Sequence, residues 1–150
     1  MASLTERISA DTKEAMKARE RSRVNALRMV SSALSNEQIS LGHELTEDEE
    51  IAVLRRQLKQ REESAEAYRE AGRDEQADSE TTEAEVIREY LPAPMSRGDL
   101  EQIADRAIEE TGASSMKDMG NVMGRAKELS ENRAEGKELS EVVRERLQGM

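Results

Sequence analysis

The sequence predicts an all-α protein in two small helical bundles, an N-terminal four-helix unit and a C-terminal three-helix tail domain. Apolar residues recur at spacings of three and four along most of the chain, and no useful stretch alternates at a period of two. Ser, Thr and Gly stand where such helices would begin and end. Two prolines, Pro92 and Pro94, lie close together and divide the pattern.

The first two expected helices form a pair, most simply an antiparallel hairpin. Ser3 or Thr5 can cap the first helix, residues 19–22 look like a connector, and Ser22 can cap the second helix. The apolar stripes are Leu4, Ile8, Ala15 and Met16 on the first helix and Val24, Leu27, Val30, Ala33 and Leu34 on the second.

A long third helix follows Gly42, which can end the second helix in the left-handed conformation. Thr46 and Glu49 have the spacing of a capping box. The apolar face of this helix keeps a seven-residue rhythm, interrupted by Arg61, and consists of Ile51, Leu54, Leu58, Ala65 and Tyr68. We expect its basic side chains to pair with glutamates of the same helix rather than bind phosphate.

An acidic stretch closes the N-terminal domain, which we expect to span residues 1–92. This stretch begins after the glycine of Ala71-Gly-Arg-Asp74 and ends in the apolar set Val86, Ile87, Tyr90 and Leu91. Residues 93–95 are the expected proline-containing linker because proline fixes the backbone and cannot donate a hydrogen bond.

Residues 96–150 are expected to form the tail domain. Ser96 can cap its first helix with Asp99 at the third position, and Gly112 can end that helix. Ser114 or Ser115 can cap a short second helix, in which Gly120 and Gly124 would let another backbone come close. The apolar faces of the three helices are Leu100, Ile103, Ala104, Ala107 and Ile108, then Met116, Met119, Val122 and Met123, then Leu139, Val142, Val143 and Leu147.

Composition and charge restrict the classes of function. The net charge of −10 argues against coating nucleic acid by bulk electrostatics. Residues 41–95 hold most of the acid excess, with 7 Lys and Arg against 16 Asp and Glu. Without cysteine, a secretory-like start or a run of roughly 20 apolar residues, the chain is expected to be cytoplasmic and without membrane contact.

Catalytic and metal-binding patterns are weak. His43 is the single histidine and stands beside Gly42 in a connector, so it predicts neither a catalytic triad nor a metal site. The carboxylates are spread along solvated helix faces, and no glycine-rich phosphate loop follows a strand. We therefore expect no enzyme activity, no small-molecule cofactor and no metal.

One stretch, Thr111-Gly-Ala-Ser-Ser-Met-Lys-Asp-Met-Gly-Asn-Val-Met-Gly124, is typical of a single family. It resembles the YqeY-like proteins, whose C-terminal domain is shared with the tail of the B subunit of tRNA-dependent amidotransferases. The motifs Leu27-Arg-Met-Val30, Lys59-Gln-Arg61, Ala71-Gly-Arg73 and Glu89-Tyr-Leu-Pro92 occur in the family's order. The resemblance therefore covers nearly the whole chain.

The resemblance implies a non-catalytic tail that holds tRNA or a tRNA-handling enzyme, since the amide chemistry of the amidotransferase belongs to other parts of that enzyme. Phosphate contacts need Lys and Arg, and few aromatic side chains are present for base stacking. The candidate contact residues lie around the Gly/Met motif and are Lys117, Arg125, Lys127, Arg133 and Lys137.

One departure from the family pattern leaves an alternative open. The turn before Arg133-Ala-Glu-Gly136 has no proline and contains Glu128 and Glu131, with Asn132 available for a left-handed backbone. Less positive charge at this turn weakens a contact with RNA. The alternative is a protein interaction adaptor that meets another protein and never touches RNA.

Overall fold

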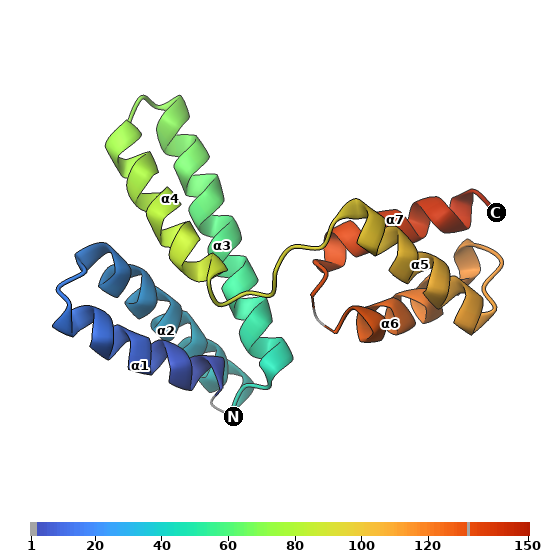
Figure 1. Cartoon of the computed structure of the whole chain (residues 1–150), viewed down its shortest axis with the longest axis horizontal. Helices are drawn as coiled ribbons and strands as arrows, with labels where there is room; N and C mark the ends of the chain where they lie inside the picture. Colours follow the sequence, from blue (N-terminus) through green and yellow to red (C-terminus); the bar gives the residue numbers. More distant parts are fainter. Residues whose placement is uncertain (1–2, 132) are drawn as a thin grey trace. The chain divides into compact units, whose positions relative to one another are not determined.

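The computed structural model describes residues 3–131 and 133–150. Within these residues the regular elements are all helical, so the expected all-α fold class is confirmed for the described chain (Figure 1). They are α1 (Leu4–Lys17), α2 (Arg21–Leu41), α3 (Glu47–Glu70), α4 (Asp74–Arg88), α5 (Arg97–Thr111), the short 3₁₀ helix η1 (Met116–Asp118), α6 (Met119–Ser130) and α7 (Gly136–Gln148).

The chain divides into two compact units, Met1–Leu91 and Pro92–Met150, here called unit 1 and unit 2. Residues 92–96 carry no regular secondary structure. None of the described helices has both the length and the apolar composition needed to cross a bilayer.

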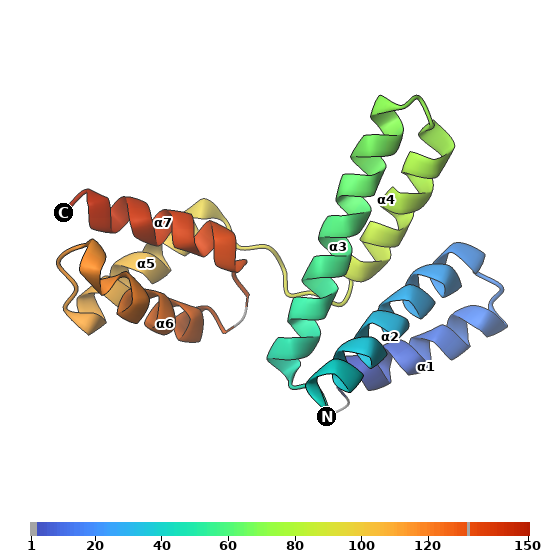
Figure 2. The same ribbon diagram turned by 180° about the vertical axis from the view of Figure 1, so that it is seen from behind.

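Unit 1 is arranged around α2, which lies between α1 and the α3–α4 pair (Figures 1 and 2). Its core collects the apolar stripes of the four helices, because burial of those faces supplies most of the free energy that holds short helices together. The buried members are Ile8, Ala15, Ala26, Leu27, Val30, Leu34, Val53, Leu54, Val86, Ile87 and Tyr90.

The helix ends of unit 1 follow the expected capping chemistry at most positions. Ser3 accepts a hydrogen bond from the Glu6 amide, and Thr46 with Glu49 forms the complete capping box. Gly42 adopts the left-handed conformation at the end of α2, with φ of 76°. Each of these motifs depends on groups close in sequence, and all three are confirmed.

The expectation that Ser22 caps α2 is wrong. Helix α2 already begins at Arg21, and no side chain caps it. The preceding turn is closed by backbone hydrogen bonds instead, from the Arg19 amide to the Met16 carbonyl at 3.2 Å and from the Glu20 amide to the Ala15 carbonyl at 3.0 Å. This closure starts the helix one residue before Ser22, which therefore lies inside its first turn.

Pairing of basic side chains within α3 is only partly confirmed. Lys59 lies 4.0 Å from Glu63 of the same helix, whereas Arg56 reaches Glu37 of α2. Arg61 is only 17% exposed and pairs with Glu80 and Glu83 of α4 at 3.4 and 3.7 Å. The charge that interrupts the apolar rhythm of α3 therefore joins two helices, a contact that sequence spacing within one helix does not reveal.

A polar network fixes the end of α4 against α1 and α2. The Tyr90 hydroxyl donates to Asp11 at 2.5 Å, and Arg23 donates to Glu89 at 2.7 Å. Burial, followed by the hydrogen bond to Asp11, raises the pKa of Tyr90 well above its ordinary value. The tyrosine therefore stays protonated and acts as a buried donor just before the prolines.

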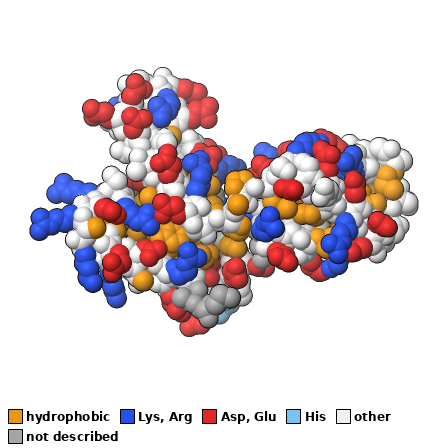
Figure 3. Space-filling model, viewed as in Figure 1, with side chains coloured by type: hydrophobic (Ala, Val, Ile, Leu, Met, Phe, Trp, Pro, Cys, Tyr) orange, Lys and Arg blue, Asp and Glu red, His pale blue; other side chains and the backbone are white. Residues whose placement is uncertain are grey.

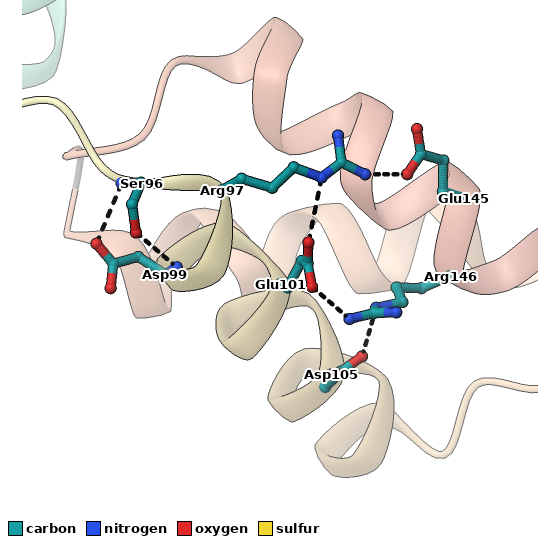
Figure 4. Close-up of polar contacts among 7 residues, drawn as sticks. All are labelled: Ser96, Arg97, Asp99, Glu101, Asp105, Glu145 and Arg146. Atoms are coloured by element: carbon teal, nitrogen blue, oxygen red, sulfur yellow. Dashed lines mark hydrogen bonds and ion pairs between the residues drawn. The ribbon is translucent and has the colours of Figure 1, made fainter.

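Unit 2 packs α5, α6 and α7 around a second core. Ser96 and Asp99 form the expected capping box of α5, and Gly112 ends that helix with φ of 68°. Figure 4 shows the adjoining charge network, in which Arg97 contacts Glu101 and Glu145 while Arg146 contacts Glu101 and Asp105, so that the first half of α5 is joined to the last turn of α7. The buried core is Leu100, Ala104, Ala107, Ala113, Val122, Ala126, Ala134, Leu139, Val142, Val143 and Leu147.

Candidate functional site

The five candidate contact residues of the tail are spread along α6 and beyond its end. An α-helix of 12 residues is about 18 Å long. Lys117 precedes this helix in η1, whereas Arg133 and Lys137 follow it. The structure thus separates Lys117 from Arg133 and Lys137 by the length of α6, with Arg125 and Lys127 on the helix between them.

Arg125 differs from the other four candidates because carboxylates balance its charge. Its guanidinium contacts Glu110 at 2.5 Å and Glu128 at 2.9 Å. These hydrogen bonds raise the pKa of Arg125, and the bond from Arg125 lowers the pKa of Glu110. In the described part of the chain no ion pair joins the other four to a carboxylate, and all four are exposed: Lys117, Lys127, Arg133 and Lys137.

Gly120 and Gly124 do not serve the close approach within the chain that their spacing predicted. Both are exposed, and a Cβ atom added at either would meet nothing within 4 Å. Helix α6 instead buries Val122 and Ala126, which lie on its other side. The two glycines therefore form an open strip of bare backbone on the outward face of α6.

Two further expectations for the tail are changed by the structure. Ser115 caps η1 as predicted, but Met116 is 40% exposed rather than turned inward, because the chain forms a 3₁₀ turn there before α6 begins. At the end of α6 it is Glu131 that takes the left-handed conformation, with φ of 51°. Asn132, which was expected to do so, lies outside the described residues.

A basic groove at the corner between α1 and α2 was missed by the sequence reasoning. It has a volume of about 610 Å³ and is lined by Met16, Arg19, Arg21, Val24, Asn25 and Arg28. Lys and Arg side chains gather at this end of unit 1 in Figure 3. Met16 was expected in the core but is 50% exposed, because its direction on α1 differs from that of Ile8 and Ala15.

The charge signal for this groove was present in the sequence at a finer scale. Residues 13–28 contain 6 Lys and Arg against 2 Glu, whereas residues 1–40 as a whole contain 7 against 5. The carboxylates elsewhere in residues 1–40 therefore mask the cluster. The α1–α2 turn brings its two halves to the same corner of unit 1.

His43 lies in the connector between α2 and α3. Its Nδ1 atom is 2.7 Å from the Glu44 carbonyl oxygen, and its Nε2 atom is 3.7 Å from a Glu49 carboxylate oxygen. The contacts of the ring are thus with the connector itself and with the first turn of α3. No cluster of three His, Cys, Asp or Glu arranged to hold a metal occurs among the described residues.

These features define a class, a small all-helical protein with an apolar core in each unit and cationic side chains on exposed surfaces. Within that class the chain belongs to the YqeY-like family. The family described as "Yqey-like protein" matches residues 5–147, so the resemblance seen in the sequence is confirmed over nearly the whole chain.

A curated relative is similar to part of the chain. It is "Altered inheritance of mitochondria protein 41, mitochondrial" of Clavispora lusitaniae (strain ATCC 42720), 33% identical over 84 residues. The matched region makes up 56% of this chain and 49% of the relative, so the match spans about half the length of that protein.

Proposed function

We propose that the protein is a non-catalytic binding module that associates with tRNA through unit 2. The resemblance of the tail to the B subunit of tRNA-dependent amidotransferases suggests this ligand and an accessory role beside such an enzyme. In this proposal the N-terminal four-helix unit and the three-helix tail are two separate bundles in a cytoplasmic protein that needs no cofactor. The observation that carries the proposal is the outward face of α6.

The bare strip on α6 supports a close approach by a polyanion. Gly120, Gly124 and Lys127 are separated by four and three residues, a spacing that puts them on one face of a helix. Lys117 precedes Gly120 by three residues and is exposed. Without Cβ atoms in the way, a sugar-phosphate backbone can approach the helix while the two lysines reach its phosphates from either side.

Aromatic residues are absent from unit 2, since Tyr68 and Tyr90 both belong to unit 1. Stacking on aromatic side chains, by which many proteins hold the bases of single-stranded RNA, is therefore not available to the tail. We propose that unit 2 recognises the shape and phosphate backbone of folded RNA, and that its affinity falls steeply with salt.

The test is fluorescence anisotropy of labelled total tRNA titrated with the full chain and with Lys117→Glu/Lys127→Glu. We expect at least tenfold weaker binding for the variant. The slope of the logarithm of the binding constant against the logarithm of the salt concentration should be shallower by about two, one for each lost phosphate contact. Arg125 is left unchanged because its replacement would also remove two ion pairs.

The matched control is Lys59→Glu/Arg144→Glu, which alters net charge equally at two exposed positions that do not belong to the strip. It should bind nearly as wild type does. Equal losses in the two variants would mean that only total charge matters, and unchanged binding in the tail variant would remove α6 from the proposed contact.

The second candidate function is a protein interaction adaptor without RNA contact. Exposed apolar side chains at the end of α2 favour it, since Ile39 is 76% exposed and Leu41 lies close behind it on the chain. The acid excess of residues 41–95 also opposes RNA. Binding of a purified amidotransferase that survives the tail variant and is lost in Ile39→Ser/Leu41→Ser would favour the adaptor.

A further inference from the structure

The basic groove at the α1–α2 corner contains three arginines. Its two neighbouring glutamates are already engaged, with Glu14 3.8 Å from Lys17 and Glu20 4.0 Å from Arg23. Arg23 also pairs with Glu89. Within the described residues no carboxylate pairs with the three arginines that line the groove, Arg19, Arg21 and Arg28.

Arg19 occupies a position that the fold alone would give to glycine. It has φ of 57°, in the left-handed region, at the residue that follows the C-cap of α1. Glycine adopts this conformation without the Cβ clash that an arginine suffers, and it is the usual residue there. An arginine at this position costs stability, and its exposed side chain contributes to the rim of the groove.

We propose that the α1–α2 groove binds the sugar-phosphate backbone of RNA, as a second contact surface separate in sequence from α6. The guanidinium groups of Arg19, Arg21 and Arg28 would bind phosphate oxygens in the bidentate manner that their planar forks allow. Asn25, exposed on the same groove, adds a neutral donor and acceptor. The inference rests on the proposed tRNA association only for the choice of RNA among polyanions.

The shape and lining of the groove favour RNA over an anionic membrane. A bilayer surface binds an exposed apolar face that can insert between lipids, whereas this surface is hollow. Met16 is its one exposed large apolar side chain, and Arg28 donates to the Met16 sulfur at 3.8 Å. The apolar group is thus in contact with a cation at the place where insertion would occur.

An acidic protein segment is also a poorer fit than RNA. Peptide grooves gain most of their affinity from apolar or aromatic anchors in well-formed pockets. The apolar part of this lining is limited to Met16 and the half-buried Val24, while three of its six residues are arginines. A regular array of phosphates, one on every nucleotide, is the ligand that repeated guanidinium groups match.

The first test uses Arg21→Glu/Arg28→Glu in the full chain, with Lys59→Glu/Arg144→Glu as the charge-matched control. Labelled total tRNA should bind the groove variant at least tenfold more weakly than the control. The slope of the logarithm of the binding constant against the logarithm of the salt concentration should be shallower by about two. The tail variant reports on α6 independently. Loss of tRNA binding in the tail variant alone would overturn the groove inference and leave the proposed function standing. Loss of tRNA binding in the groove variant alone would support the groove inference and overturn the proposed contact through unit 2.

Arg19→Gly provides a readout that a purely structural role cannot produce. The variant should unfold at higher urea concentration than wild type, because glycine relieves the backbone strain, and should bind tRNA several-fold more weakly. Unchanged tRNA binding would contradict the assignment of Arg19 to RNA contact. A lower urea midpoint would contradict the claim that Arg19 costs stability.

Two further probes are titrated with the same groove variant, vesicles of phosphatidylcholine with phosphatidylserine and a poly-glutamate chain. RNA contact predicts that tRNA is the ligand whose binding falls most. If the groove variant keeps wild-type affinity for tRNA but loses the vesicles, the surface meets a membrane; if it loses only poly-glutamate, it meets an acidic protein. Either result overturns the inference.

Discussion

Replacing Gly120 and Gly124 by alanine should make unit 2 more stable and its association with tRNA weaker. Neither residue has a positive φ, and an added Cβ at either meets open space within 4 Å. Gly124 lies inside α6 and Gly120 in its first turn. Alanine loses less backbone entropy than glycine in a helix, so both substitutions favour the folded state.

The expected gain follows from these positions. Gly124→Ala should add about 1 kcal/mol to the free energy of unfolding. Gly120→Ala should add about 0.5 kcal/mol, because helix propensity counts for less in the first turn than in the interior of a helix. The double variant should therefore be stabilised by about 1.5 kcal/mol, which for a unit of this size raises the melting temperature by about 6–12 °C. Binding of tRNA should weaken severalfold because two methyl groups now cover the bare strip.

The assay must read unit 2 separately from unit 1. Amide hydrogen exchange along α6 in the full chain reports on unit 2, and tyrosine fluorescence reports on unit 1 because Tyr68 and Tyr90 both lie there. Gly112→Ala is the matched control, expected to destabilise by about 1 kcal/mol since its φ is 68°. Faster exchange along α6 in the double variant would contradict the expected gain in stability and would mean that the strip is packed.

Two predictions concern unit 1. Glu50 is 3% exposed and accepts hydrogen bonds from the Thr5 amide and hydroxyl at 2.7 and 2.6 Å. Glu50→Ala should therefore lower the free energy of unfolding, measured in urea, by about 1–3 kcal/mol. A negligible change would contradict a stabilising role for these buried hydrogen bonds. Burial, then the charge of Glu80, raises the pKa of Glu83. Ionised Glu83 therefore opposes folding, and Glu83→Gln should gain stability over wild type as pH rises above about 4.3; a pH-independent difference would contradict this sign.

The end points of helices were predictable from sequence because they are decided by groups a few residues apart. Thr46 with Glu49, Ser96 with Asp99, and the left-handed Gly42 and Gly112 all follow this rule. The Ser22 prediction failed because backbone groups of the α1–α2 turn supply their own hydrogen bonds. Local capping rules do not state which of two competing solutions a turn adopts.

Contacts between helices were much less predictable. Arg61 was expected to pair with glutamates of its own helix but pairs across to α4, and Met16 was expected in the core but lies half exposed. The spacing of Gly120 and Gly124 indicated that another backbone comes close to this helix, but not whether that backbone belongs to this chain or to another molecule. Each case depends on the direction of a side chain once several helices have packed, which periodicity in one helix leaves open.

The most direct test of the account is binding of total tRNA to the purified full chain at about 50 mM salt, where phosphate contacts are strongest, and again at about 150 mM. Association with RNA predicts micromolar binding at the lower salt and weaker binding at the higher salt. Absence of binding at the lower salt would contradict RNA association through either α6 or the α1–α2 groove and would leave the adaptor as the function to pursue.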